Sequence, residues 1–268
     1  MSPGQKRQAV RELRQAGLPW RAALALGHAS FGYRRITAVL RRQGWRVNPK
    51  RVYRLYRQMD LQRPTRRKGR RGVKRPVTFM PTEAQAPGQV WAIDFLEDKL
   101  VSGRRLRILN VLDLCSRYAL DSLVEHSLTG ELAARHLERL FLSHGAPRVL
   151  RRDQGPEFES RVFQKLLRSW RIKYEPVPKG QPFDNGHVES FNGSLRDELL
   201  DAELFHSLEE AQTKMAGWLH WYNSERPHQS LGYRTPHERW EAAAPQGASV
   251  SDRPPPPEGR LGMISHAG

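Results

Sequence analysis

Three carboxylates stand out because the elements around them could bring them together: Asp94, Asp153 and Glu189. Asp94 lies inside the apolar segment 91–95, where a charge is costly unless it is paired or bound to a cation. Asp153 follows an expected strand at a sharp turn, and Glu189 lies near the start of an expected helix. Hard divalent cations prefer carboxylate oxygens, and two such ions about 3.5–4 Å apart assist phosphodiester displacement. The three acids are therefore candidates for metal-dependent phosphodiester chemistry.

Each acid taken alone also has an ordinary structural explanation. Asp94 could pair with an arginine, Asp153 could simply form its turn, and Glu189 could be a surface charge on a helix. The chemical interpretation depends on the order of all three acids and on the elements that carry them.

An alternation of strands and helices is expected to position these acids. Apolar runs joined by tight turns predict three consecutive strands, at 90–98, 104–114 and 117–127. A helix–strand–helix–strand–helix series then follows, at 130–142, 148–153, 160–171, 172–177 and 187–200. This order predicts an α/β fold, with a mixed sheet and helices on its faces.

The N-terminal quarter has a different character. Residues 1–75 contain 22 Lys and Arg against two acids, whereas residues 76–268 contain 23 Lys and Arg against 26 acids. Helical spacing predicts two helix pairs here, from 5–16, 20–28, 31–44 and 49–59. Basic helices can be mere solvated faces, but two pairs in so basic a segment favour a helix-turn-helix that binds double-stranded DNA.

The composition suggests boundaries and a compartment. A run too basic to fold alone begins at Arg63, so we expect a helix-turn-helix region at 1–62 and a basic linker at 63–85. The catalytic core is expected at 86–242 and a disordered, proline-rich tail at 243–268.

A single cysteine, Cys115, excludes a disulfide framework. With no apolar signal segment or membrane span, a cytoplasmic, nucleoid-associated protein without a membrane partner is expected.

Several motifs resemble the insertion-sequence transposases of the retroviral-integrase superfamily, of the type encoded by the second of two overlapping frames. Two of them lie in the basic quarter, FGYRRI (31–36) and VNPKRVYRLY (47–56). The core matches are WAIDF (91–95), LNVLDLCSRYAL (109–120), RRDQGPEF (151–158), DNGHVESFNGSLRDELL (184–200) and YNSERPHQSLGYRTP (222–236). The 35 residues between Asp153 and Glu189 match the family's D-D-35-E spacing.

The resemblance implies a ribonuclease H-like fold in which Asp94, Asp153 and Glu189 hold two Mg²⁺ or Mn²⁺ ions. It implies cleavage of element ends by water and joining of the freed 3′-hydroxyl to target DNA, without a covalent protein–DNA intermediate. Terminal inverted repeats and a homo-oligomer on DNA are the implied partners. Arg196 matches a basic residue seven positions after the glutamate, on the same helix face. The other expected DNA contacts are Arg34, Arg35, Lys50, Arg51 and Arg54.

The other residues singled out in the sequence are expected to have supporting or structural roles. Asn185 and Asn192 are candidates to support the catalytic acids, and Asp113, which matches a recurrent family position, is interpreted as structural. The aromatic group Trp218, Trp221 and Tyr222 is expected to be core, and an arginine–glutamate pair with Glu203 competes with the phosphate role of Arg196. The histidines without metal-site spacing are read as ordinary polar residues: His220, His228 and His237.

Two alternative functions remain open. A non-catalytic DNA-binding repressor derived from a transposase would bind element ends without cleaving them. A structure-specific nuclease of the same fold would cleave DNA without joining strands.

Overall fold

The computed structural model describes residues 30–58, 81–152, 156–176 and 186–243. Within these ranges no helix is both long enough and apolar enough to cross a membrane. The expected helices at 5–16 and 20–28 and the expected tail at 243–268 lie almost entirely outside them.

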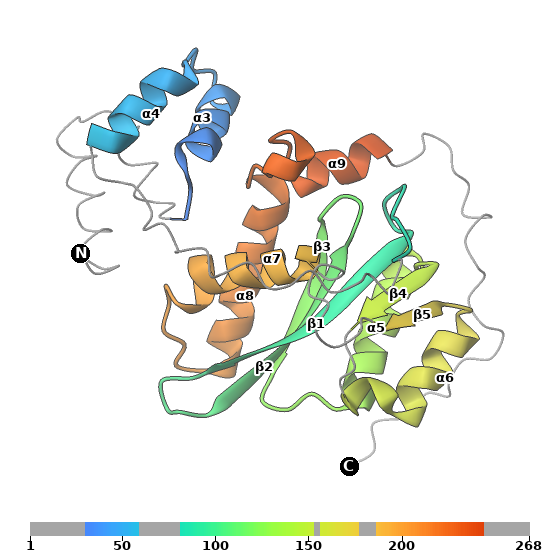
Figure 1. The fold of residues 1–268 in the computed structure, drawn as a ribbon. Coiled ribbons are helices and arrows are strands. Elements are labelled where there is room, and N and C mark those ends of the chain that lie inside the picture. Colours follow the sequence, from blue (N-terminus) through green and yellow to red (C-terminus); the bar gives the residue numbers. More distant parts are fainter. Residues whose placement is uncertain (1–29, 59–80, 153–155, 177–185, 244–268) are drawn as a thin grey trace, which may run out of the picture.

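A five-stranded mixed sheet forms the centre of the fold (Figure 1). Its strands are β1 Val90–Lys99, β2 Arg105–Asp113, β3 Ala119–Glu125, β4 Val149–Arg152 and β5 Lys173–Pro176. They lie in the order β3-β2-β1-β4-β5. The first three strands are antiparallel neighbours, whereas β4 runs parallel to both β1 and β5. The mixed sheet and all five expected strands are confirmed.

Side chains alternate between two apolar clusters because successive strand residues point to opposite faces of a sheet. On β1, Trp91 and Ile93 pack with α5 (Gly130–His144) and α6 (Arg161–Ser169). Val90 and Ala92 pack instead with α7 (Gly186–Leu195) and α8 (Leu208–Ser224). Asp94 has the same parity as Ala92, so the strand places it on the α7 side.

The long helix expected at 187–200 is divided. The α-helix α7 ends at Leu195, and η3 (Arg196–Leu200) continues it as a π-helical turn. The shorter helices are η1 (Pro156–Glu159), η4 (Gln229–Leu231) and α9 (Pro236–Ala243).

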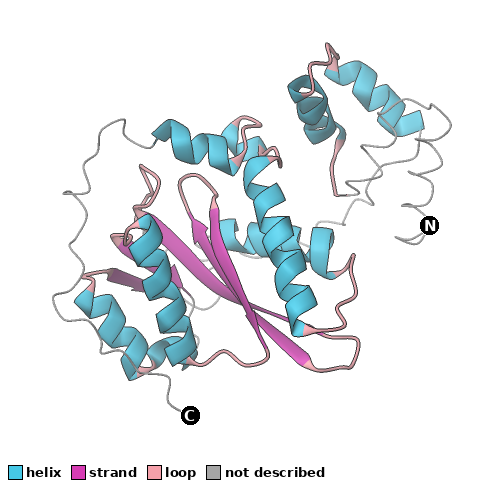
Figure 2. Ribbon diagram, turned by 180° about the vertical axis from the view of Figure 1, so that it is seen from behind, coloured by secondary structure: helices cyan, strands magenta, loops and turns pink. Residues whose placement is uncertain are grey.

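The second expected N-terminal helix pair is present as α3 (Tyr33–Arg42) and α4 (Pro49–Gln58) and stands as a lobe beside the core (Figure 2). Its own small apolar cluster contains Phe31, Ile36, Leu40, Val52 and Tyr56. The lobe also contacts the core, since the ring of Phe31 stacks on Trp221 at 5.9 Å between centroids. Arg42 adds a hydrogen bond to the Tyr233 carbonyl (3.1 Å) and an ion pair with Glu238.

Candidate active site

Asp94 lies in the middle of the central strand and is half-buried. Its Oδ1 accepts a hydrogen bond from the Phe95 amide (2.9 Å), and its Oδ2 accepts one from Asn192 Nδ2 on α7 (2.7 Å). The strand therefore supplies the acid, and the helix packed across it sets the direction of the carboxylate.

A buried chain of hydrogen bonds supports this contact. Ser122 Oγ donates to Asn110 Oδ1 (2.6 Å), and Asn110 Nδ2 donates to Asn192 Oδ1 (2.7 Å). The three side chains are 8%, 0% and 8% exposed, and they connect β3, β2 and α7 before the chain reaches Asp94 on β1. Because each amide oxygen accepts a bond, each amide nitrogen is directed at the next group. The chain orients Asp94 with neutral groups.

The sequence indicated Asn192 as a supporting residue, and the structure gives it that position. Asn110 and Ser122 were missed. Both are polar residues in the middle of strands, on the face that also carries Ile108 and Leu112. Asn110 could have been identified from the sequence, because it is a polar residue between two apolar residues, Ile108 and Leu112, on the same face of the strand. Asn185 lies outside the described residues.

Glu189 lies in the first turn of α7 and is exposed. In the described part of the chain its carboxylate makes neither a hydrogen bond nor an ion pair. Asn192 and Arg196 follow it at spacings of three and seven, so the three residues share one helix face. This face is directed at β1, because Asn192 bonds Asp94 and Arg196 Nη2 donates to the Glu97 carbonyl (2.8 Å).

Arg196 is 40% exposed, and its second contact is a long ion pair with Asp201 (3.7 Å) rather than one with Glu203. Glu203 is instead paired with Lys214 (3.3 Å). The arginine therefore joins the end of the helix to β1 while part of its guanidinium remains open to solvent.

Asp153 itself lies outside the described residues. It directly follows β4, whose last residue, Arg152, is paired in register with Ile93 of β1. In the sequence, Asp94 and Asp153 thus directly follow two residues that are paired across neighbouring parallel strands. Among the described residues, which leave out Asp153, no group of three acids, histidines or cysteines could hold a metal ion.

Two consecutive buried arginines anchor the strand that leads to Asp153. Arg151 pairs with Glu175 of β5 (2.8 Å) and donates to the Thr82 carbonyl (2.7 Å). Burial opposes ionisation of Glu175, but hydrogen bonds from Thr82 and Arg151 outweigh it and lower the pKa of that carboxyl. Arg152 is fully buried, stacks over the Tyr174 ring at 4.1 Å, and pairs with Glu159 (2.7 Å).

The donor set fits a hard divalent cation. Asp94 supplies carboxylate oxygens from the strand, and Glu189 offers an open carboxylate from the facing helix. Oxygen ligands of this kind are those that Mg²⁺ and Mn²⁺ take in proteins.

The other polar residues singled out by sequence have structural surroundings. Asp113 is fully buried and accepts hydrogen bonds from the Gly88 amide (2.8 Å) and from the amide and hydroxyl of Ser116 (2.7 and 2.6 Å), which agrees with a structural role. Burial raises the pKa of this carboxyl. Trp218 and Tyr222 are core residues as predicted.

The three histidines lie in different settings. His220 is exposed, and His237 pairs with Glu241 (3.2 Å). His228 is not the ordinary polar residue that was expected, because it is only 8% exposed and lies beside Arg226. Burial and then the charge of Arg226 lower the pKa of His228 well below its usual range.

The basic residues of the helix pair divide into two groups. Lys50, Arg51 and Arg54 are exposed on α4, and Arg34 is exposed on α3, as expected for an outward basic face. Arg35 differs, since it is half-buried, stacks over Phe31 (5.5 Å) and lines a cavity against the core. Arg35 therefore lies on the side of α3 that docks on the core, and its predicted DNA contact stays a prediction.

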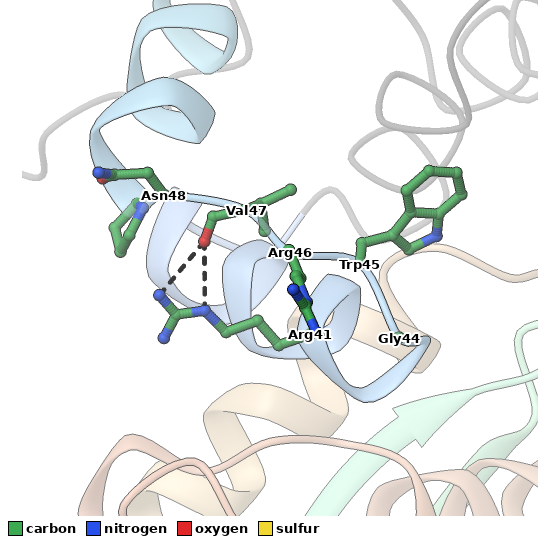
Figure 3. Close-up of a pocket in the computed structure, with 7 residues that line it drawn as sticks. Arg41, Gly44, Trp45, Arg46, Val47 and Asn48 are labelled. Carbon is green, nitrogen blue, oxygen red and sulfur yellow. Dashed lines mark hydrogen bonds between the residues drawn. The ribbon is translucent and has the colours of Figure 1, made fainter.

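The turn between α3 and α4 is shaped by its own contacts (Figure 3). Arg41 Nε and Nη2 both donate to the Val47 carbonyl (3.3 and 3.2 Å), and Asn48 Oδ1 caps α4 at the Lys50 amide (2.9 Å). A cavity of about 560 Å³ lies along this turn, with Trp45 44% exposed beside it. The turn thus presents an aromatic ring next to the basic face of α4.

Comparison with known proteins gives consistent matches along the chain. Residues 84–182 and 170–236 match integrase core domain models, and residues 8–69 match an HTH-like domain. The chain is 41% identical over 217 residues to an uncharacterized protein of insertion element IS407 from Burkholderia multivorans, covering 80% of this chain and 77% of that one. It is 28% identical over 221 residues to the transposase for insertion sequence element IS904 from Lactococcus lactis, covering 77% and 85%.

The fold has a counterpart among solved structures. A chain from the structure of the simian T-cell lymphotropic virus intasome in complex with PP2A regulatory subunit B56 gamma aligns over 90% of this chain and 80% of its own length, with 18% identity and a TM-score of 0.54. At this identity the match concerns the fold, a ribonuclease H-like mixed sheet preceded by a helical region. The sequence matches themselves establish that the chain belongs to the insertion-sequence transposases with an integrase core domain.

Proposed function

We propose that this transposase cleaves the ends of its element and joins the freed 3′-hydroxyl to target DNA, with Asp94, Asp153 and Glu189 holding two Mg²⁺ or Mn²⁺ ions. The observation that carries the proposal is the Asn192–Asp94 hydrogen bond (2.7 Å). It joins the strand bearing the first acid to the helix face bearing Glu189, whose carboxylate is open. The parallel register of β1 and β4 supports the inclusion of Asp153.

Each of these residues has a distinct part in the site. Bound metal ions would supply Lewis acidity at the scissile phosphodiester. Asn192 keeps the Asp94 carboxylate oriented while leaving lone pairs for a cation. Arg196 holds its helix against β1 through the Glu97 carbonyl, and the open part of its guanidinium is suited to a substrate phosphate.

DNA recognition is assigned to the helix pair. Lys50, Arg51 and Arg54 form an exposed basic face on α4, with Arg34 on α3. Basic residues of this kind bind phosphates with release of counterions, and their helix can enter the major groove. The partners proposed are the terminal inverted repeats and target DNA, on which the protein acts as a homo-oligomer in the bacterial nucleoid.

Metal-dependent nicking of a DNA end by the purified full chain tests this function. The substrate is a duplex carrying an end of the element, and the control is Glu189→Gln, which keeps the side chain's size but removes its charge. We expect nicking and strand joining with Mg²⁺, and neither activity from the variant, with DNA binding retained.

The alternatives give different results in the same assay. Binding without nicking by the wild-type protein would contradict the transposase and favour a repressor. Nicking without joining would favour a structure-specific nuclease.

A further inference from the structure

A second polar site lies on the flank of α7 that faces away from Asp94. His187, Ser190 and Ser194 follow one another at spacings of three and four, so they form a face distinct from that of Glu189 and Asn192. This face lines a cavity of about 470 Å³. Phe191 of α7 also lines it, and the other lining residues come from α3, the β2–β3 turn, α8 and the segment after it: Arg35, Arg117, Tyr222, Arg226, His228, Gln229 and Ser230.

The positive charge of Arg226, one of the lining residues, is neutralised by an ion pair. This arginine is 2% exposed and makes a bidentate contact with Glu198, with Nη2 at 2.8 Å and Nε at 2.9 Å from the carboxylate. It also donates to Ser194 Oγ (3.0 Å). The charge of Glu198 therefore balances that of Arg226.

Arg117 is a second cation of the cavity, and it forms no ion pair with any described residue. It is half-buried and adopts φ +64°, a left-handed conformation that is strained for a side-chain-bearing residue. In the described ranges its guanidinium donates one hydrogen bond, to the Leu114 carbonyl, and forms no ion pair. Burial lowers the pKa of Arg117, and the nearby Tyr222 and Asp113 offset only part of this effect.

Neutral donors complete the site. The Ser190 hydroxyl forms no hydrogen bond with any described residue, and it lies in the same cavity wall as Ser194. Arg226, Arg35 and Arg117 all act on buried His228 and lower its pKa beyond the effect of burial. The cavity thus combines a positive potential with free N–H and O–H donors, the combination that a phosphate requires.

We propose that this cavity binds a backbone phosphate of the DNA substrate, on the opposite side of α7 from the catalytic acids. The assignment rests on the proposed DNA transposase function and adds Arg117 and Ser190 as DNA-contacting residues that the sequence did not indicate. A strand engaged there and at the active site would be held on both flanks of the helix that carries Glu189.

The test is the salt dependence of DNA binding by the full chain, measured with a fluorescent duplex over a series of KCl concentrations. Losing one phosphate contact reduces the slope of log K against log salt by about 0.9 and weakens binding roughly tenfold at low salt. We expect this loss for Arg117→Gln, and recovery of the slope for Arg117→Lys. Arg168→Gln, an exposed arginine of α6, is the matched control and is expected to bind as the wild type does.

Ser190→Asp keeps the test valid if Arg117→Gln folds poorly. The new carboxylate can pair with Arg117, so the variant is expected to melt no lower than the wild type while it loses the same binding. An unchanged slope for Ser190→Asp, with Arg54→Gln weakening binding in the same assay, would overturn the cavity proposal and leave DNA binding intact. Absence of binding by the wild type would instead overturn the proposed function.

A second arm separates DNA phosphate from free phosphate. Inorganic phosphate at constant ionic strength is expected to compete with the duplex only weakly. If it raises the melting temperature of the wild type but not of Arg117→Gln, while the DNA slopes stay equal, the cavity is a free-phosphate site and the DNA assignment is wrong.

Discussion

The catalytic core and the helix pair use polar side chains in opposite ways. In the core, polar groups such as Asn110, Arg152 and Arg226 are buried, and each has specific partners on other elements. In the helix pair, the interior is mainly apolar, and the basic residues except the half-buried Arg35 lie at the surface. Substitutions in the core should therefore have large effects that depend on position, whereas those on the helix pair should have small, salt-dependent ones.

The largest effect is expected from breaking the buried Arg226–Glu198 pair. Arg226→Met leaves the Glu198 carboxylate, whose side chain is 8% exposed, without its cation, and should lower the free energy of unfolding by about 3–5 kcal/mol. Urea denaturation measures this change. The double variant Arg226→Met/Glu198→Leu should recover much of the loss, because both charges are removed together. Equal midpoints for the wild type and the single variant would show that the pair is not structural.

Asn192→Leu should reduce nicking by about 10–100-fold without a comparable loss of stability, since it removes the donor that orients Asp94. The effect should include a higher Mg²⁺ requirement, which nicking rates over a Mg²⁺ series measure. Gly193→Ala is the matched control, because a Cβ there meets no atom within 4 Å. If Asn192→Leu keeps the wild-type Mg²⁺ dependence, the hydrogen-bond chain does not affect metal binding at the site.

His228 should make stability depend on pH. Its pKa lies far below the ordinary value of 6.5 in the folded protein, so below pH 6.5 the unfolded chain binds a proton that the native state does not. The free energy of unfolding should therefore fall as pH falls, by up to about 1.4 kcal/mol per pH unit. Urea midpoints between pH 7 and pH 5 measure this slope for the wild type and for His228→Gln, which should show a shallower one. Parallel slopes would contradict a buried neutral histidine.

The smallest effect is expected on the helix pair. Arg54→Gln should weaken duplex binding only a few-fold and reduce the salt slope by about 0.9, because one exposed phosphate contact is lost. Fluorescence titrations over a KCl series provide the measurement. Its thermal stability should equal that of the wild type, and a marked loss of stability would mean that Arg54 belongs to the interior.

The strands were predictable because their alternation and turns are local properties of the chain. The break after Leu195 was not, since the π-helical turn that follows has an ordinary helical sequence. The position of Arg35 depends on how α3 docks on the core, which the helical spacing of its own residues does not show. Burial of His228 and Arg226 likewise arises from contacts between segments distant in the sequence.

In the candidate site, too, some residues could be predicted from the sequence and others could not. Acids that match a known spacing were identified, and their roles remain predictions. Asn110 and Ser122 belong to no motif with a known spacing. Their contact with Asn192 exists only because β2, β3 and α7 pack together. Sequence therefore indicates the reactive groups more readily than the neutral groups that orient them.

Anomalous diffraction from crystals of the full chain soaked in Mn²⁺ tests the central claim most directly. The account predicts manganese peaks bridged by carboxylate oxygens of Asp94, Asp153 and Glu189, at coordination distances of about 2.0–2.3 Å. Peaks elsewhere, or carboxylates too far apart to share an ion in the soaked crystal, would contradict it.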